Sequence, residues 1–172
     1  KAKQSAESKL QVKKDNLSLL NQQLLPKDTY QRYITFIDEN KITNDERRTS
    51  LLHEITQLNA NINSMQESLR DLDELQYDVN CSFCMNNIFV KKAIEARTQI
   101  PILEEQLRAM NNELDTVETT LNVIKGYVDT IDANKQSMQR CRQIEIEIKL
   151  IHSEIDGINS KLTNEFNTQE QL

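Results

Sequence analysis

Glycine, proline and tryptophan are scarce in this sequence. Its 172 residues include Gly 2, Pro 2 and Trp 0, where average usage would give about 12 glycines and about 8 prolines. Sheets and barrels need these residues at their many turns, so the composition excludes such folds and favours a few long helices. Gly126 and Gly157 alone also cannot form the glycine-rich loops that bind nucleotide phosphates.

Hydrophobic residues are also fewer than in an ordinary globular domain, at 37% against 28% charged residues, and the net charge is −6. Adjacent basic residues occur only as pairs, which we interpret as solvated helix faces: Lys13-Lys14, Arg47-Arg48 and Lys91-Lys92. A nucleic-acid surface needs larger basic clusters. No apolar run is long enough to span a membrane, and no signal peptide is present. The sequence starts with Lys1 and ends inside a polar helical pattern, so we expect a fragment of a larger protein. We expect it to be intracellular, from the nucleus or from the cytoplasm or nucleoid, without a membrane segment.

Apolar residues recur at alternating steps of four and three, the spacing of a coiled coil. The first series is Leu51, Ile55, Leu58, Ile62, Met65, Leu69, Leu72 and Val79, with Gln76 as a polar member. A second series runs from Ile100 to Ile131, falters at Lys135, Met138 and Arg142, and resumes with a shifted phase from Ile144 to Leu162. Such a phase slip changes the local winding of a coiled coil.

These series predict an all-α fold, a long antiparallel coiled-coil hairpin. Its ascending arm is 1–79, with a break near 26–28 at Pro26 and a stretch at 38–46 that is either a loop or a poorly packed helix. A hook follows at 80–87. The descending arm is 88–172, with a kink near Pro101 and the phase slip at 135–143. With the apex near residue 83, paired residue numbers should sum to roughly 166, which places Pro26 opposite about residue 140.

Cys81 and Cys84 form a CxxC motif at the predicted apex. A closed zinc site has four ligands, so we expect two hairpins to meet tip to tip and share one zinc ion through four thiolates. The flanking apolar residues should pack around the thiolates and contact the second copy: Tyr77, Val79, Phe83, Ile88 and Phe89. Zinc binding needs deprotonated thiols, so acid or a chelator should weaken this homodimer. His53 and His152 are interpreted as solvated surface residues, and Cys141 as a small buried hydrophobic residue.

On Cys81, Cys84 and the flanking arms, the sequence resembles the zinc hook of the Rad-fifty branch of the SMC-like ATPases, the double-strand-break-repair family. Ser82 stands where the usual family pattern, CPxC, has proline. Hook-bearing phage recombination ATPases, anti-phage SMC-like proteins and anticodon nucleases are similar as well. The resemblance implies zinc-mediated dimerisation at the apex, linking ATPase heads that act on DNA with a nuclease partner. The head motifs are absent, so no catalytic residue and no enzyme activity is expected of this segment.

Three other hypotheses were considered for the function of this chain. The chain could be a coiled-coil scaffold with an incidental CxxC, which would associate without metal. It could be a thiol-redox switch in which a Cys81–Cys84 disulfide opens the tip. The third, a four-helix bundle with a carboxylate metal site, requires a Glu-x-x-His motif, and neither histidine has Glu three residues before it.

Overall fold

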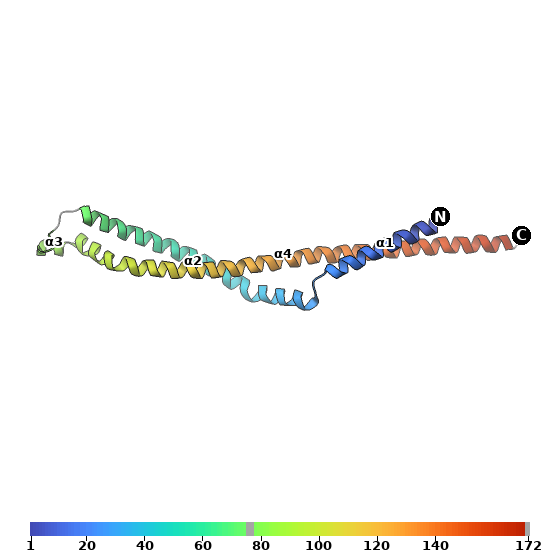
Figure 1. The fold of residues 1–172 in the computed structure, drawn as a ribbon, viewed down its shortest axis with the longest axis horizontal. Coiled ribbons are helices and arrows are strands. Elements are labelled where there is room, and N and C mark those ends of the chain that lie inside the picture. The colour runs from blue at the N-terminus through green and yellow to red at the C-terminus, as the bar shows by residue number, and fades with distance from the viewer. Residues whose placement is uncertain (75–77, 171–172) are drawn as a thin grey trace. The chain divides into compact units, whose positions relative to one another are not determined.

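The computed structural model describes residues 1–74 and 78–170, and it is all-α over these ranges (Figure 1). The described residues form four helices and no strand: α1 (Ala2–Gln23), α2 (Lys27–Glu74), α3 (Ser82–Asn86) and α4 (Ile88–Glu170). None of these helices is long and apolar enough to cross a membrane. The chain divides into two units, of which unit 1 comprises residues 1–35 and 126–172, and unit 2 comprises residues 36–125.

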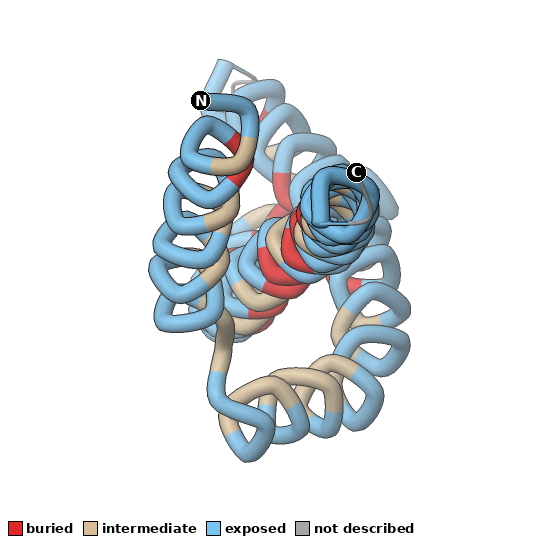
Figure 2. Tube along the Cα trace, turned by 90° about the vertical axis from the view of Figure 1, so that its right-hand side faces the viewer, coloured by how far each residue is buried: buried red, intermediate tan, exposed pale blue. Residues whose placement is uncertain are grey.

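In unit 2, α2 and the first part of α4 pack against each other in opposite directions (Figure 1). The two largest fully buried side chains are Leu51 and Leu72, both from the first apolar series, and Ile62 between them is also buried. Their α4 counterparts include Val90, Ala93, Ala96, Ile100, Val117 and Ile124. Each fully buried leucine contributes about 1.5–3 kcal/mol relative to an exposed one. Buried residues (red) follow one side of the α4 tube in Figure 2, as expected for a helix that packs along a narrow stripe.

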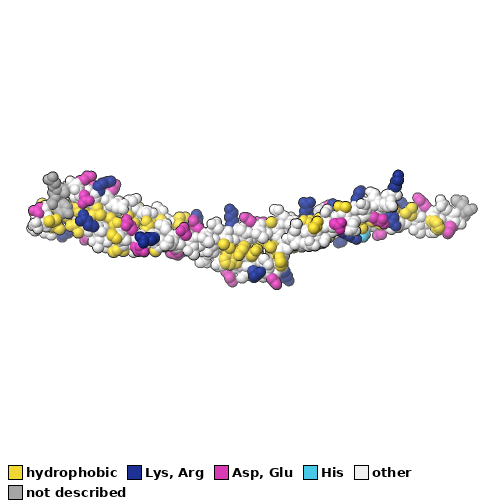
Figure 3. Space-filling view, viewed as in Figure 1, with side chains coloured by type: hydrophobic (Ala, Val, Ile, Leu, Met, Phe, Trp, Pro, Cys, Tyr) yellow, Lys and Arg dark blue, Asp and Glu magenta, His cyan; other side chains and the backbone are white. Residues whose placement is uncertain are grey.

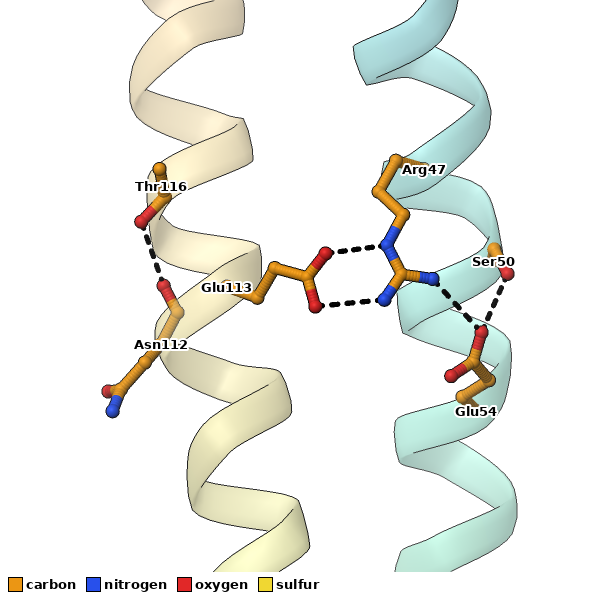
Figure 4. A network of polar contacts seen from close by, with 6 residues as sticks. All are labelled: Arg47, Ser50, Glu54, Asn112, Glu113 and Thr116. Atoms are coloured by element: carbon orange, nitrogen blue, oxygen red, sulfur yellow. Dashed lines mark hydrogen bonds and ion pairs between the residues drawn. The ribbon is translucent and has the colours of Figure 1, made fainter.

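An exposed ion pair joins the two helices of unit 2. Arg47 donates two hydrogen bonds to Glu113, from Nε at 2.6 Å and from Nη2 at 2.8 Å, and its Nη1 lies 3.3 Å from Glu54 (Figure 4). Ser50 donates a further bond of 2.7 Å to Glu54. A two-point contact between a guanidinium and a carboxylate is more directional than a single bond. The hydrogen bonds from Arg47 also lower the pKa of Glu113.

The polar stretch 38–46, which the sequence left open as a loop or a helix, is helical and lies inside α2. Two asparagines bond to the carbonyl group one turn earlier: Asn40 Nδ2 to Phe36 O and Asn44 Nδ2 to Asn40 O, both at 2.8 Å. These bonds satisfy polar side chains without interrupting the helix. The backbone of α2 therefore continues through a stretch that offers little apolar surface.

In unit 1, α1 packs antiparallel to the last part of α4. Lys13 Nζ lies 2.5 Å from Glu147 Oε2, and this contact lowers the pKa of Glu147. The buried side chains are small or medium-sized: Ala6 on α1, and Ile131, Cys141, Ile144 and Ile155 on α4. Cys141 is 5% exposed, so the interpretation of this thiol as a small buried residue is confirmed.

The chain leaves helical geometry between Gln23 and Lys27, where proline was expected to interrupt the arm. Leu24 is extended, with φ −66° and ψ 143°, and the residue before a proline is also disfavoured in a helix. The Leu25 backbone N–H donates to Asn134 Oδ1 at 2.8 Å across to α4. Asn134 is 8% exposed, and among the described residues it is the polar residue that is buried. We call this contact the α1–α2 joint.

The α4 residue at the α1–α2 joint differs from the expectation that Pro26 faces about residue 140. Leu25 bonds to Asn134, six residues earlier on α4. The pair therefore departs from the constant sum of residue numbers that an even hairpin of two unbroken helices would give. The buried stripe passes from Ile131 to Asn134 and then to Cys141, while Lys135, Met138 and Arg142 are exposed. The stripe therefore changes phase just before the predicted 135–143 stretch.

Two further features lie along these helices. The rings of Tyr33 and Tyr127, both in unit 1, stack with centroids 4.0 Å apart and planes at 8°. Pro101 lies inside α4, and the helix continues through it. A proline removes one backbone hydrogen bond from a helix, and α4 continues on both sides of Pro101 despite this loss.

Candidate metal centre

The described part of the connection between α2 and α4, residues 78–87, includes a turn built by an aspartate. The Asp78 carboxylate accepts a 2.9 Å hydrogen bond from the Asn80 backbone N–H, and the Asp78 carbonyl accepts a 3.1 Å bond from the Cys81 N–H. Aspartate commonly stabilises turns in this way. No described residue has a positive φ. The turn therefore needs no glycine, which agrees with the scarcity of that residue.

Cys81 and Cys84 lie on either side of the first turn of α3. Cys81 is the N-cap of this helix, with extended backbone angles of φ −88° and ψ 115°, and its carbonyl accepts a 3.0 Å bond from the Met85 N–H. Residues three apart lie on the same face of a helical turn, so the CxxC spacing brings both thiols to one side. Both cysteines are half-buried and neither is in a disulfide. They can therefore be reached by a metal ion.

Asn87 joins the end of α3 directly to the start of α4. Its backbone N–H donates to the Cys84 carbonyl at 3.2 Å, which closes α3. Its side-chain Oδ1 accepts from the Phe89 N–H at 2.9 Å and its carbonyl accepts from the Lys91 N–H at 3.0 Å, which begins α4. An asparagine at the N-cap satisfies an amide that lacks a helical partner. One residue thus ends one helix and begins the next.

The backbone around Cys81 favours the ionised form of its thiol. The Cys84 backbone N–H, the Cys84 side chain and the Phe83 backbone N–H hydrogen-bond to Cys81, and together they lower the pKa of the Cys81 thiol. Partial burial acts in the opposite direction and has a smaller effect. Thiolates are the form of cysteine that binds metals, and zinc readily accepts them. The donor set of this segment therefore fits half of a four-thiolate zinc site.

The apolar residues predicted to surround the thiolates are exposed in the single chain. Val79 is 64% exposed, Phe83 82%, Ile88 61% and Phe89 74%, and Tyr77 lies outside the described residues. Within one chain, these four side chains therefore lack the packing partners of a closed cluster. Their predicted contact with a second copy stays a prediction.

Three residues that support this segment were not singled out from the sequence: Asp78, Met85 and Asn87. Met85 packs against the small core of Leu72, Val90 and Ala93, together with Leu69 and Ile94. A methionine that follows a CxxC motif within an apolar rhythm is a weak signal for such a contact. Asp78 and Asn87 were detectable in principle, because aspartate and asparagine are favoured in turns and at helix N-caps.

The remaining candidate ligands do not join the cysteines. His53 and His152 are exposed on α2 and α4, as predicted, and Cys141 is buried in unit 1. Within residues 1–74 and 78–170, no three His, Cys, Asp or Glu side chains cluster closely enough to hold a metal ion. One chain thus offers a pair of thiol ligands at this segment.

Comparisons with known proteins were made at the levels of family, sequence and structure. No family model, no curated protein and no solved structure matches this chain. Proposals about its function therefore depend on the residues and geometry described above.

Proposed function

We propose that residues 80–87 form a zinc-dependent dimerisation site at the tip of an antiparallel coiled-coil hairpin. The observation that supports this most strongly is the placement of Cys81 and Cys84. Both are accessible thiols on one helical turn, in the segment that joins two antiparallel helices. The backbone amides that favour the Cys81 thiolate add to this argument.

The ligand count makes the proposed site a shared one. Zinc in a structural site is four-coordinate, and each chain supplies two thiols at this segment. Cys81 and Cys84 from two copies would complete the set, with the ion on the two-fold axis of the dimer. The zinc ion would supply the bonds that hold the two chains together. The contribution of the chain is to hold both thiols on one side and to keep one of them easily ionised.

The larger function follows from the resemblance to Rad-fifty-type SMC-like ATPases. In this proposal the helices are arms, and the dimer connects two ATPase heads that lie outside this sequence. The assembly would tether DNA in double-strand break repair, recombination or genome defence, with a nuclease as partner of the heads. The segment itself would bind zinc and carry no enzyme activity.

The test is metal analysis combined with native mass spectrometry of the purified chain. We expect about one zinc ion for each pair of chains, and a return to monomer when a chelator removes it. Cys81→Ser and Cys84→Ser should each lose the metal and the dimer together. Cys141→Ala is the matched control, because it removes a thiol far from the segment and should keep both.

The same experiment distinguishes the alternatives. A dimer that contains no metal and survives both serine substitutions would favour a coiled-coil scaffold with an incidental CxxC. A redox switch predicts that free thiols are lost on oxidation and recovered with a reductant, while the dimer changes without zinc. Counting free thiols with and without reductant measures this directly.

A further inference from the structure

The two helix ends beside the cysteines carry opposite charges. The last turn of α2 carries Asp71 and Glu74, which we call the acidic end, and the start of α4 carries Lys91 and Lys92, which we call the basic end. All four side chains are exposed. Glu74 lies seven residues before Cys81 and Lys91 lies seven residues after Cys84. Both kinds of charge are visible at this end of unit 2 in Figure 3.

These charges do not stabilise the helices that carry them. The C-terminus of a helix has a partial negative charge and the N-terminus a partial positive one. Acids in the last turn of α2 and bases in the first turns of α4 are therefore placed unfavourably. Neither helix has the favourable alternative there, since α2 has no basic residue in its last turn and α4 no acidic residue in its first turn.

Pairing within the chain does not explain the four charges either. Across this end of unit 2, the helices are joined by the ion pair of Asp73 and Arg97, with a distance of 3.5 Å. Within the part of the chain that the structure describes, Asp71, Glu74, Lys91 and Lys92 form no ion pair. These four residues are thus free to interact with another molecule that meets this end.

A second copy of the chain can meet the tip in two symmetric ways. In the crossed arrangement, α2 of each chain lies opposite α4 of its partner, and in the matched arrangement like helices lie opposite each other. A two-fold axis through the shared zinc allows both. The crossed arrangement places each acidic end opposite a basic end. The matched arrangement places acid opposite acid and base opposite base, which is unfavourable.

We propose that the acidic and basic ends select the crossed arrangement of two copies at the zinc site. This inference rests on the proposed function, because it specifies the partner surface of that same dimer. The exposed apolar residues Phe83, Ile88 and Phe89 lie between the two charged ends in the sequence. They would form the centre of the contact and the charges its rim. The zinc ion supplies affinity, and the charges supply orientation.

The test uses a charge-swapped variant that carries Asp71→Lys, Glu74→Lys, Lys91→Glu and Lys92→Glu. Its net charge is unchanged, and each new charge has the sign that its helix end favours, so loss of folding is not expected. Metal-free wild-type chains with an isotope label are mixed with unlabelled variant chains. Zinc is then added at low salt, and native mass spectrometry counts the mixed dimers. Glu104→Lys with Lys125→Glu is the control, with a charge exchange far from the tip.

Random association gives about half mixed dimers, and we expect this for the control. In the crossed arrangement, each chain type pairs with itself, because a mixed dimer would bring like charges together. Mixed dimers should then fall below about one fifth, and should return towards half in about 1 M salt, which screens exposed charges. In the matched arrangement, mixed dimers exceed half.

A mixed fraction below half at low salt that rises towards half in high salt supports the crossed arrangement, whatever its size. Mixed dimers at or above half at low salt overturn the crossed arrangement. A bias that high salt does not reduce also overturns it, because the cause would not be electrostatic. Failure of wild-type chains to form any zinc-dependent dimer instead refutes the proposed function, so the two failures can be told apart.

Discussion

The α1–α2 joint leads to a quantitative prediction about Asn134. Its Oδ1 accepts a 2.8 Å hydrogen bond from the Leu25 backbone N–H, and Asn134 is 8% exposed. Asn134→Ala removes this acceptor from the part-buried Leu25 amide, and leaving a buried polar group unsatisfied costs about 1–3 kcal/mol. Alanine also favours a helix over asparagine by up to about 0.7 kcal/mol. The net loss in the free energy of unfolding should therefore be about 0.3–2.3 kcal/mol.

Asn122→Ala is the matched control, because Asn122 is an exposed asparagine of the same helix. It should gain helix propensity without losing a contact, so the two variants should differ by about 1–3 kcal/mol. Urea unfolding followed by circular dichroism measures the difference. Hydrogen exchange of the Leu25 amide gives a local readout, and it should accelerate about tenfold for each 1.4 kcal/mol lost. Equal stability of the two variants, with unchanged exchange at Leu25, would refute the role of Asn134.

Three further predictions concern packing and pH. The Arg47 contact lowers the pKa of Glu113, so this contact stabilises the fold above pH 4.5, the ordinary pKa, and its contribution is lost as the pH falls through the lowered pKa. In acid titrations, the free energy of unfolding of Glu113→Gln should therefore fall less than that of wild type as the pH passes below the lowered pKa. Parallel curves for the two proteins would contradict this. Gly126→Ala should raise the free energy of unfolding by about 0.5–1 kcal/mol, because an added Cβ meets nothing within 4 Å; lower stability in urea would argue against it. Replacing Tyr33 and Tyr127 by leucine, singly and together, should give a coupling energy of about 0.5–1.5 kcal/mol, whereas additive effects would show that their stacking adds nothing.

The all-α class and the stripe of buried residues were predictable, because the spacing of the apolar residues in the sequence indicates which of them share one face of a helix. Leu51, Ile62 and Leu72 were assigned to one series by spacing alone, and all three are buried. The stretch 38–46 was ambiguous for the same reason, since it has little apolar periodicity. Its helix depends on the continuity of α2 on both sides and on local bonds such as that of Asn40.

The joint could not be predicted because it depends on two residues that are 109 positions apart. Pro26 indicated a break, yet nothing local to Pro26 identifies Asn134 as the residue that satisfies the freed amide. The predicted partner was displaced, because a constant sum of paired residue numbers assumes two unbroken helices and the chain leaves helical geometry at this joint.

The placement of the two candidate cysteines on one helical turn was predictable, and the bonds that support this segment were less so. The spacing of Cys81 and Cys84 is visible in the sequence, and residues with this spacing lie on one side of a single helical turn. The backbone bonds from Asp78 and to Asn87 were not foreseen, because each depends on where a helix ends. The exposure of Phe83 depends on whether a second chain covers it, and a single sequence does not contain that information.

The double role of Asn87 has a mechanical consequence for the thiols. Since it closes α3 and begins α4, no spare residue separates the two helices, and Cys84 lies only three residues before it. A rotation of α4 about its own axis near Ile88 would therefore turn α3 and move Cys84 relative to Cys81, with no linker to absorb the twist. Torsional load on the helix would in this way reach the two sulfur atoms directly.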